Sequence, residues 1–432
     1  MRSRGKLRAA PAMLASAAVA LLAGLLLLRQ AVASAWDTIW AEDGFEFLAD
    51  ALSGNPLATV LEPHGGYIHL PPRAAAAITA LLPLDAAAVT FAVIWALVVA
   101  LLAAFVYAAS AEILRSRALR LALAALAALL PAAGSELLGN ATNLHFWLVH
   151  ACFWAFVWRS TTVPALASRT TVVAVTALSD PLTLLFAPLA LWNAVARRER
   201  RELMVPAALV AGLAVQLGVT ALAGEPPQRL TAFDPADLPL LYALRVTGSL
   251  LVGDRFLDDA WLSLGRLFAY GSLIAVGAAL VAGAARVRGA TRLFVAVAAG
   301  YSVLLFGVFL AGRGTAGMRP GTDEATWHLA GARFTYAPIL LLTAALLALV
   351  DRYAATAAGP GGHRAVGATV VVVAVLVGAN FDLTSERSLG PTWRPQLEAA
   401  RQRCDAGARA ARIPVAPEPF GFALDASCQD LR

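Results

Sequence analysis

The stretch WAEDGFEFLADAL (40–52) follows the first long apolar run of the chain and places Glu42 and Asp43 side by side. The run before it, 13–34, is long enough to cross a hydrocarbon layer of about 30 Å, which takes about 20 apolar residues. The two acids therefore stand where a first membrane-spanning helix meets water. More apolar runs follow, so this stretch marks the first of several membrane boundaries.

The composition excludes most soluble classes of protein. The chain has 432 residues, of which 59% are hydrophobic and 14% charged, and its mean hydropathy is +0.69. These values are typical of a multi-pass membrane protein. The formal net charge is +6, but the Arg residues are spread between apolar runs, where they set membrane topology. We therefore expect a lipid bilayer as partner and no nucleic acid.

The apolar runs predict the fold class. Only a helix satisfies its own backbone polar groups in lipid, so each run is interpreted as a helix. The runs are 13–34, 86–110, 119–134, 143–159, 166–179, 182–196, 203–223, 262–283, 291–312, 333–350 and 365–381. We predict an all-α, polytopic transmembrane protein of about eleven spans. Residues 1–381 form its transmembrane domain, and residues 382–432 form a tail.

The Arg distribution predicts the orientation. Arg residues gather at the start and in alternate loops, namely 115–120, 159–169, 197–201, 286–292 and 351–364. The positive-inside rule places these in the cytoplasm, together with the N-terminus. The opposite loops, exoplasmic by the same rule, are 35–85, 135–142, 224–261, 313–332 and 382–432. We expect a plasma-membrane protein with an exoplasmic tail. An alternative is a signal peptide cleaved at AVASA (31–35); an uncleaved first helix is preferred, because the run is long enough to span.

The tail contains Cys404 and Cys428. Exoplasmic compartments are oxidising, so a disulfide between them is expected. It would close a loop of about 25 residues and contribute about 3 kcal/mol to the stability of the tail. The alternative is two unpaired thiols. The rest of the tail predicts a short helix followed by an irregular segment.

The first outer loop, 35–85, is the most informative region. Its early part places apolar residues at i, i+3, i+4 and i+7, which makes one apolar helix face: Phe45, Leu48, Ala49 and Leu52. Its later part, 68–83, is apolar but too short and too rich in Pro to span. Both segments predict helices lying in the membrane interface. The Gly65–Gly66 pair between them allows a sharp turn that brings the neighbouring polar residues close to the acids.

This loop carries a resemblance to a known family. The pattern WAEDGFEF…PHGGYIHLPPR (40–73) follows a first membrane helix, and NATNLHFWL (140–148) and GARFTYAP (331–338) support it. The chain resembles the GT-C superfamily of integral-membrane glycosyltransferases, which use polyprenyl-phosphate sugars. It is most similar in pattern to uncharacterised actinobacterial-type members. The resemblance covers most of the chain in layout, but only the quoted motifs in sequence.

The resemblance implies roles for the acid pair. Transfer of a sugar from a lipid phosphate needs a base that takes the proton of the acceptor hydroxyl. By resemblance, Asp43 is the general base. Glu42 is a helper or the base itself, because adjacent residues on a helix point about 100° apart. The alternative for Asp43 is a solvated cap of the following helix.

Other polar residues become candidates for binding the substrate. Arg73 and Arg333 are expected to hold the phosphate, because a guanidinium matches phosphate oxygens. The remaining candidates are His64, Tyr67, His69, Asn143, His145, Asp180 and Tyr336. Alternatives stay open for several of them: a headgroup anchor for Arg73, a snorkelling helix end for Arg333, a packing role for His69, and helix caps for Asn143 and Asp180.

The sequence also bears on cofactors and on competing functions. The chain has no Walker or HExxH motif, and no metal site is predicted, although the resemblance leaves open a divalent cation at Asp43. The expected donor is a polyprenyl-phosphate sugar, and the acceptor, whether glycan, lipid or protein, is not determined. The alternatives are a transporter or flippase of a lipid-linked precursor and a non-catalytic envelope-assembly protein. Clustering of polar residues at the outer boundary favours the enzyme over a transporter, whose charges lie near the midplane.

Overall fold

The structure, a computed structural model, describes most of the chain. It covers residues 6–29, 35–132, 134–159, 162–196, 199–223, 233–314, 318–320, 331–357, 360–381, 387 and 390–431. Residues 31–34 of the AVASA stretch lie outside the described residues, so its cleavage is not addressed.

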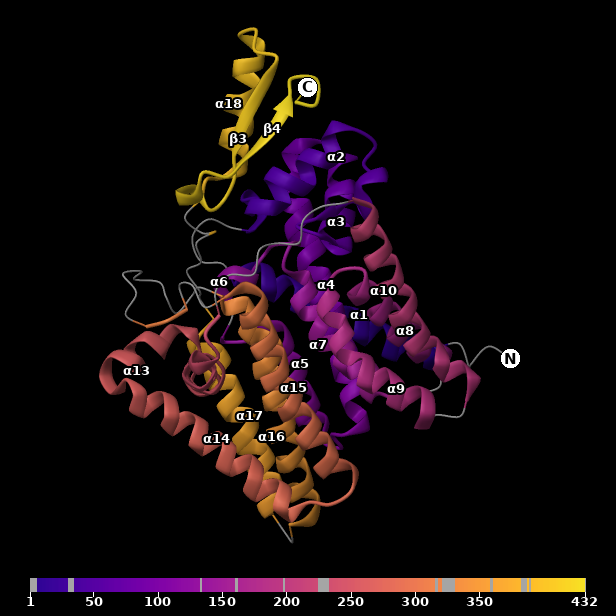
Figure 1. The fold of residues 1–432 in the computed structure, drawn as a ribbon, viewed down its shortest axis with the longest axis vertical. Helices are drawn as coiled ribbons and strands as arrows, with labels where there is room; N and C mark the ends of the chain where they lie inside the picture. The colour runs from indigo at the N-terminus through magenta and orange to yellow at the C-terminus, as the bar shows by residue number, and fades with distance from the viewer. Residues whose placement is uncertain are drawn as a thin grey trace.

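The predicted all-α transmembrane fold is confirmed, because each predicted apolar run lies on a helix. In chain order these helices are α1 (Lys6–Leu28), α4 (Ala87–Ala109), α5 (Arg117–Leu129), α7 (Leu144–Val157), α8 (Val163–Ala177), α9 (Ala187–Ala196), α10 (Met204–Ala223), α14 (Arg266–Arg286), α15 (Ala290–Arg313), α16 (Tyr336–Thr356) and α17 (Gly361–Ala379). Figure 1 shows them as one bundle, with α14 along one side.

By length and composition, six helices of the described chain can cross a membrane. Four apolar helices are shorter: Ala15–Leu28, Leu144–Val157, Val163–Ala177 and Pro181–Ala196. A bent pair, Pro235–Val252 with Asp254–Leu264, meets at 111° and makes a seventh span if it is one unit. The structure therefore supports a multi-pass protein without fixing the predicted number of spans.

The bent pair was not predicted, because it lies in the expected loop 224–261. It contains α11 (Leu238–Tyr242), a π-helical turn (Ala243–Gly248), α12 (Ser249–Val252) and α13 (Leu257–Leu264). The bend falls at Gly253, whose φ of 77° favours glycine. A Cβ there would lie 2.3 Å from Oδ1 of Asn380. Only glycine therefore allows α17 to pack against the bend.

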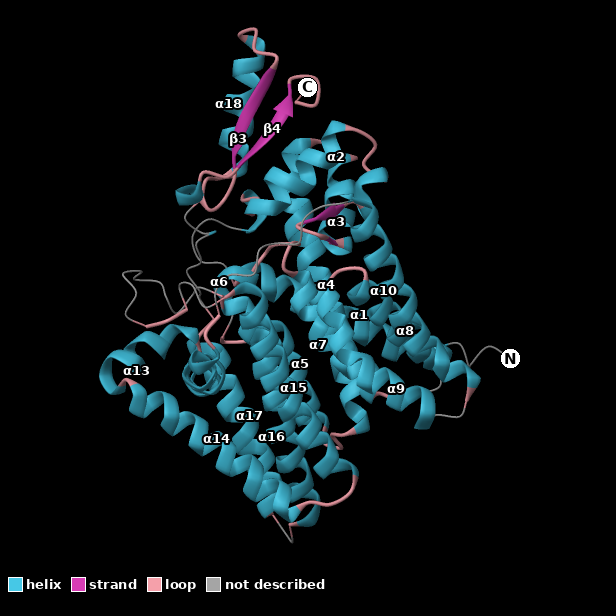
Figure 2. Ribbon diagram, in the orientation of Figure 1, coloured by secondary structure: helices cyan, strands magenta, loops and turns pink. Residues whose placement is uncertain are grey.

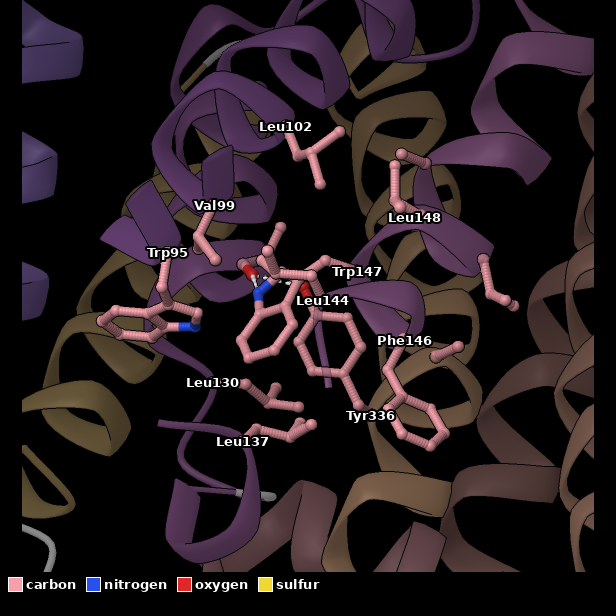
Figure 3. Packing of buried hydrophobic residues seen from close by; sticks show 14 of the residues in the cluster. Trp95, Val99, Leu102, Leu130, Leu137, Leu144, Phe146, Trp147, Leu148 and Tyr336 are labelled. Carbon is pink, nitrogen blue, oxygen red and sulfur yellow. Dashed lines mark hydrogen bonds between the residues drawn. The ribbon is translucent and has the colours of Figure 1, made fainter. Parts of the chain in front are cut away.

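The core of the bundle lies between α4, α7 and α16 (Figure 3). Trp147 donates a hydrogen bond from Nε1 to the Ala127 carbonyl over 3.1 Å, and the Tyr336 hydroxyl donates to the same carbonyl. Tyr336 is only 2% exposed and stacks near Trp147, with ring centroids 5.0 Å apart. The Tyr336 hydroxyl is therefore used inside the core, and this geometry does not support the predicted role of Tyr336 in binding substrate.

The loops sort to the two ends of the bundle. At one end, Asp351 accepts hydrogen bonds from the backbone amides of Arg115 and Ser116, which joins two loops predicted to share the cytoplasmic side. Arg159 lies there too, 3.7 Å from Glu112. Figure 1 shows the first outer loop and the tail together at the opposite end.

Arg169 differs from the other loop charges. It is fully buried and binds Glu202 through two hydrogen bonds of 2.9 Å. Its guanidinium also donates to the Ala155 carbonyl over 2.9 Å. Arg169 therefore ties α8 to the turn before α10, and its interpretation as a loop charge that sets topology is wrong.

The first outer loop consists of short elements stacked on the end of the bundle. They are a π-helical turn (Asp43–Leu48), α2 (Ala49–Ser53), the hairpin β1 (Pro63–His64) and β2 (Tyr67–Ile68), and α3 (Leu70–Ala80). The hairpin turns on Gly65 and Gly66, with φ of 60° and 91°. Pro71 and Pro72 occupy the first turn of α3, where a missing amide donor costs nothing.

The tail packs onto this loop (Figures 1 and 2). Its helix α18 (Trp393–Asp405) is followed by an antiparallel hairpin of β3 (Ala410–Pro414) and β4 (Ala423–Ser427). The prediction of an irregular segment after the helix is therefore wrong. Cys404 and Cys428 are joined by a disulfide. Phe422 stacks on Phe45 with ring centroids 5.0 Å apart. The tail is therefore docked and not merely tethered.

Candidate functional site

A cavity of about 340 Å³ lies at the end of the bundle covered by the first outer loop. Six parts of the chain form its walls: the turn that bears Glu42 and Phe47, the β1–β2 hairpin, the start of α7, the hinge at 180–182, the end of α15 and the turn Ala332–Thr335 before α16. Its polar lining comprises Glu42, His64, Tyr67, His69, Thr142, Asn143, His145, Asp180, Arg313 and Arg333. Four polar residues of the first outer loop therefore share one cavity with residues from later parts of the chain: Glu42, His64, Tyr67 and His69.

Three predicted site residues do not line the cavity: Asp43, Arg73 and Tyr336. Asp43 is fully buried, and its carboxylate accepts three hydrogen bonds from the segment before α7. The donors are the Ala141 amide (2.8 Å), the Thr142 amide (2.8 Å) and the Thr142 hydroxyl (2.6 Å). Both carboxylate oxygens are occupied, so Asp43 holds the outer loop to the start of α7.

Burial raises the pKa of Asp43 to about 6, while the hydrogen bonds from Thr142 and Ala141 and the charge of Arg387 pull it down. The carboxylate is therefore ionised at neutral pH, as its donors require. Arg387 in turn donates to the Thr38 side chain over 2.7 Å and to the Gly139 carbonyl. This geometry does not support the prediction that Asp43 is the general base, because it faces a structural network.

The same contacts test a divalent cation at Asp43. A cation would need carboxylate oxygens that already bind amide and hydroxyl donors, so the residues present do not fit one there. Within the described part of the chain, no group of three or more His, Cys, Asp and Glu side chains is placed to hold a metal ion. The Asp43 carboxylate therefore binds the protein and is not arranged as a cation ligand.

Glu42 occupies a different position from its neighbour. It lines the cavity, is partly exposed, and lies close enough to His64 to raise the pKa of that imidazole. Within the described residues, no hydrogen bond or ion pair engages its carboxylate. Of the adjacent acid pair, Glu42 is the one that can meet a ligand.

Arg73 is used inside the loop. Its guanidinium is 2% exposed and donates to Oδ2 of Asp50 over 2.7 Å and to the Pro63 carbonyl over 3.3 Å. It also lies over the Phe47 ring, 5.2 Å from the centroid. Arg73 therefore joins α3 to α2 and the hairpin, and this geometry does not support its predicted role in holding a phosphate.

Two other guanidiniums reach the cavity, those of Arg313 and Arg333. Arg313, the last residue of α15, donates to the Tyr67 hydroxyl over 3.4 Å. Arg333 is held by Glu136, whose carboxylate accepts from the Gly331 and Arg333 amides over 3.2 and 3.1 Å. A pair of cations at one side of a cavity suits a phosphate ligand. Arg313 and Arg333 thus line the cavity, whereas Arg73 does not, and a phosphate-binding role for Arg333 stays a prediction.

His64 and Glu46 form an ion pair at the cavity rim, with 2.8 Å between Nδ1 and Oε1. The hydrogen bond that His64 donates to the Glu46 carboxylate raises the pKa of His64 and lowers the pKa of Glu46. The pair fixes the hairpin against the π-helical turn that begins at Asp43. His64 is thereby positioned beside Glu42.

The inner wall holds His69, His145 and Asp180. His69 is 6% exposed, and its Nε2 lies 3.1 Å from the His64 carbonyl. His145 is 8% exposed, and its Nδ1 lies 3.7 Å from Oδ2 of Asp180. Asp180 also caps the turn that follows it, since its Oδ1 accepts from the Leu182 amide over 2.8 Å. Asp180 thus caps this turn and also lines the cavity, and its predicted role in binding substrate stays a prediction.

Asn143 lines the cavity, but its amide group donates to the Glu136 carbonyl over 2.8 Å. Its own backbone amide donates to Oδ1 of Asn140 over 3.0 Å. The side chain of Asn143 makes no cap hydrogen bond to α7. It therefore stiffens the loop that Asp43 also binds.

Sequence reasoning missed Arg313, Glu136 and Arg387. A signal existed for Arg313, because it follows the apolar run 291–312 on the side where the positive-inside rule disfavours Arg. An Arg placed against that rule needs a partner or a ligand. Glu136 and Arg387 had no comparable signal, since their partners are backbone groups far away in sequence.

Comparisons with known proteins add little. No family model matches the chain, and no curated protein matches it. Among solved structures, it is similar to the oligosaccharyltransferase of Archaeoglobus fulgidus, tethered through a disulfide bond to an acceptor peptide containing the NVT sequon. The identity is 13% and the TM-score 0.41, over 90% of this chain and 57% of that one. A likeness at this level assigns no activity to this chain, which spans 57% of the length of that protein.

Proposed function

We propose that this protein is a membrane glycosyltransferase that moves a sugar from a polyprenyl-phosphate donor to an acceptor hydroxyl at the exoplasmic face. The observation that supports it best is the cavity between the first outer loop and the helix ends. It combines a carboxylate open to a ligand, Glu42, with two guanidiniums, Arg313 and Arg333. The first-loop resemblance supports the same reaction.

The reaction needs two kinds of group, and the cavity offers both. The acceptor oxygen attacks the anomeric carbon of the sugar while the bond from that carbon to the phosphate oxygen breaks. The acceptor proton passes to the Glu42 carboxylate, which acts as general base. The bonding electron pair leaves with the lipid phosphate, and Arg313 and Arg333 stabilise the added negative charge.

The neighbouring acid has a supporting role in this proposal. Asp43 grips the backbone at 141–142, while Glu136 grips the backbone at 331 and 333. These two contacts set the distance between the wall that bears Glu42 and the wall that bears Arg333. Such positioning matters because displacement of about 1 Å can lower a rate about 100-fold.

The sidedness of the site follows from the charge pattern. The cavity lies at the end of the bundle opposite the Arg-rich loops, which the positive-inside rule places in the cytoplasm. A donor whose chain is anchored in the outer leaflet would then present its phosphate at the ends of α15 and α16. The tail would lie on the same exoplasmic side, where its disulfide is chemically favoured.

The test uses the full chain in lipid nanodiscs with a panel of polyprenyl-phosphate sugars, and it measures release of polyprenyl phosphate. We expect release by the native protein and its loss in Glu42→Gln. The matched control is Asp85→Asn, since Asp85 is an exposed acid paired with Arg401 outside the cavity. Release that is equal in Glu42→Gln and the control would refute the proposed base.

The competing functions give different results in the same preparation. A flippase would move labelled lipid across a vesicle membrane while the sugar–phosphate bond stays intact. A non-catalytic assembly protein would neither release lipid phosphate nor move lipid. Absence of release across the whole panel, with the protein folded, would therefore contradict the enzyme.

A further inference from the structure

The inner end of the cavity holds buried polar atoms without partners. Among the described residues, Nδ1 of His69 and both ring nitrogens of His145 make no hydrogen bond. Oδ2 of Asp180 lies 3.7 Å from Nδ1 of His145, and the Ser179 backbone lies near the same ring. Buried polar atoms are almost always satisfied in folded proteins. These three atoms belong to two side chains that line the cavity, so a polar group bound there, from a ligand or a water, would satisfy them.

The chemistry of these atoms selects the kind of ligand. A neutral imidazole offers one donor and one acceptor, and burial holds His69 neutral by lowering its pKa well below the usual range. Asp180 contributes an acceptor. A hydroxyl both donates and accepts, so a pair of neighbouring hydroxyls matches this set. A phosphate, which only accepts when ionised, matches this set of donors and acceptors less well.

An aromatic surface adjoins these atoms. Tyr67 lies against His69, with ring centroids 3.9 Å apart, and lines the cavity together with Phe146 and Phe334. Aromatic faces beside a few placed polar groups are typical of small-ligand sites. Tyr67 also joins the two ends of the cavity, because its hydroxyl accepts from Arg313. The hydroxyl-binding atoms and the guanidiniums are thus one aromatic side chain apart.

We infer that the inner end of the cavity is the sugar subsite and takes a single uncharged monosaccharide, two of whose hydroxyls bind Asp180 and His145 while its ring lies against Tyr67. This inference rests on the proposed function, since it names the part of the donor that this end would hold. A sugar acid is disfavoured, because its carboxylate would face Asp180 and Glu42 in a partly buried site. The phosphate lies toward Arg313 and Arg333.

The test measures equilibrium binding by the full chain in nanodiscs. The probes are bare polyprenyl phosphate, its glucosyl, galactosyl and mannosyl esters, and its glucuronosyl ester. For the native protein, we expect at least one neutral sugar ester to bind about tenfold tighter than the bare lipid phosphate, and the glucuronosyl ester to show no such gain. We call the ratio of the Kd of bare polyprenyl phosphate to the Kd of its sugar ester the sugar contribution.

Two variants separate this role from a structural one. Asp180→Asn keeps the oxygen that caps the turn at Leu182 but loses the carboxylate charge. His145→Phe keeps a ring beside Phe146 and removes the unpaired nitrogens, so its Tm should not fall. Both variants are expected to lose the sugar contribution while the Kd for bare polyprenyl phosphate stays within about threefold. A matched control, Arg313→Gln, should weaken binding of the bare and sugar-bearing lipids alike.

The remaining outcomes of these binding measurements contradict the sugar subsite, the transfer reaction or both. Equal binding of bare and sugar-bearing lipids by the native protein overturns the sugar subsite and leaves the phosphate site standing. The sugar subsite is also overturned if Asp180→Asn weakens the bare lipid phosphate as much as its sugar esters. A sugar contribution without any release of lipid phosphate overturns the transfer reaction but not the subsite. Binding of none of these lipids overturns both.

Discussion

Two sets of polar groups lie at the same end of the bundle and differ in how their hydrogen bonds are used. In the first set, which we call the frame, every group grips the protein itself: Asp43, Arg73, Glu136 and Arg387. In the second, the cavity wall, groups face open space: Glu42, His69, His145 and Asp180. Buried polar groups that are hydrogen-bonded to the protein hold its structure, whereas polar groups without such partners are available to a ligand. The difference separates scaffold from site.

The adjacent acids show the contrast at its sharpest. Glu42 and Asp43 are one residue apart, yet Asp43 is fully buried against the start of α7 and Glu42 lines the cavity. The π-helical turn that begins at Asp43 directs the two side chains to different neighbours. Two neighbouring carboxylates are therefore expected to have different roles, and a substitution of each acid should show which role it has.

The largest expected effect is on catalysis. Glu42→Gln should lower transfer about 100- to 10,000-fold, because the amide cannot accept the acceptor proton. Its stability should match that of the native protein, since within the described residues Glu42 makes no contact that the amide would lose. Activity is measured as release of polyprenyl phosphate, and stability as Tm in detergent. A drop in Tm with activity retained would move Glu42 into the frame.

The next effect is on stability. Asp43→Ala removes three hydrogen bonds and leaves the Ala141 and Thr142 amides buried without partners. The free energy of unfolding should fall by about 3 kcal/mol, given about 1–3 kcal/mol for each buried donor left unsatisfied. Denaturant titration of the purified protein checks this. An Asp43→Ala protein that is as stable as native but inactive would show that Asp43, and not Glu42, is the base.

A smaller effect separates the guanidiniums. Arg333→Gln should weaken binding of polyprenyl phosphate about tenfold, because a charge-assisted hydrogen bond is lost. Arg73→Gln should leave that affinity unchanged and lower the Tm, since Arg73 pairs with Asp50 inside the loop. Both quantities are measured on the same nanodisc preparations. Weaker lipid binding by Arg73→Gln at an unchanged Tm would place Arg73 in the site after all.

The smallest effect is a dependence of stability on pH. The His64–Glu46 hydrogen bond raises the pKa of His64 from 6.5 and lowers that of Glu46 from 4.5. The His64 contribution is complete below pH 6.5 and is lost as pH rises through its raised pKa. The Glu46 contribution is complete above pH 4.5 and is lost as pH falls through its lowered pKa. The pair therefore stabilises most between these values, by about 0.2–1 kcal/mol.

Glu46→Gln measures this contribution. The difference in Tm between the native protein and the variant should be greatest near pH 5.5 and shrink toward pH 8. A difference that grows with pH would mean that His64 is held neutral by the cavity. His64 would then belong to the cavity wall, and not to the rim that its ion pair with Glu46 stiffens.

Much of the architecture could be predicted from local sequence. Apolar runs of sufficient length become helices in lipid wherever they fall, because no other conformation satisfies the backbone there. The segment 35–85 was likewise expected to hold short helices and a glycine turn, and it does. The bent pair at 235–264 escaped prediction, because Arg245 and Gly253 interrupt its apolar pattern and their accommodation depends on Asn380 and other distant residues.

The sequence by itself determined an all-helical membrane protein and the loop in which polar residues would gather, because hydropathy and chain length act locally. Only the tertiary structure decided which of those residues face a cavity. Asp43 and Arg73 do not face the cavity, because each binds a partner that it meets only after folding. Asp43 binds Ala141 and Thr142, and Arg73 binds Asp50. Arg313 lines the cavity because α15 ends beside the β1–β2 hairpin, and such long-range contacts are not encoded by any local pattern.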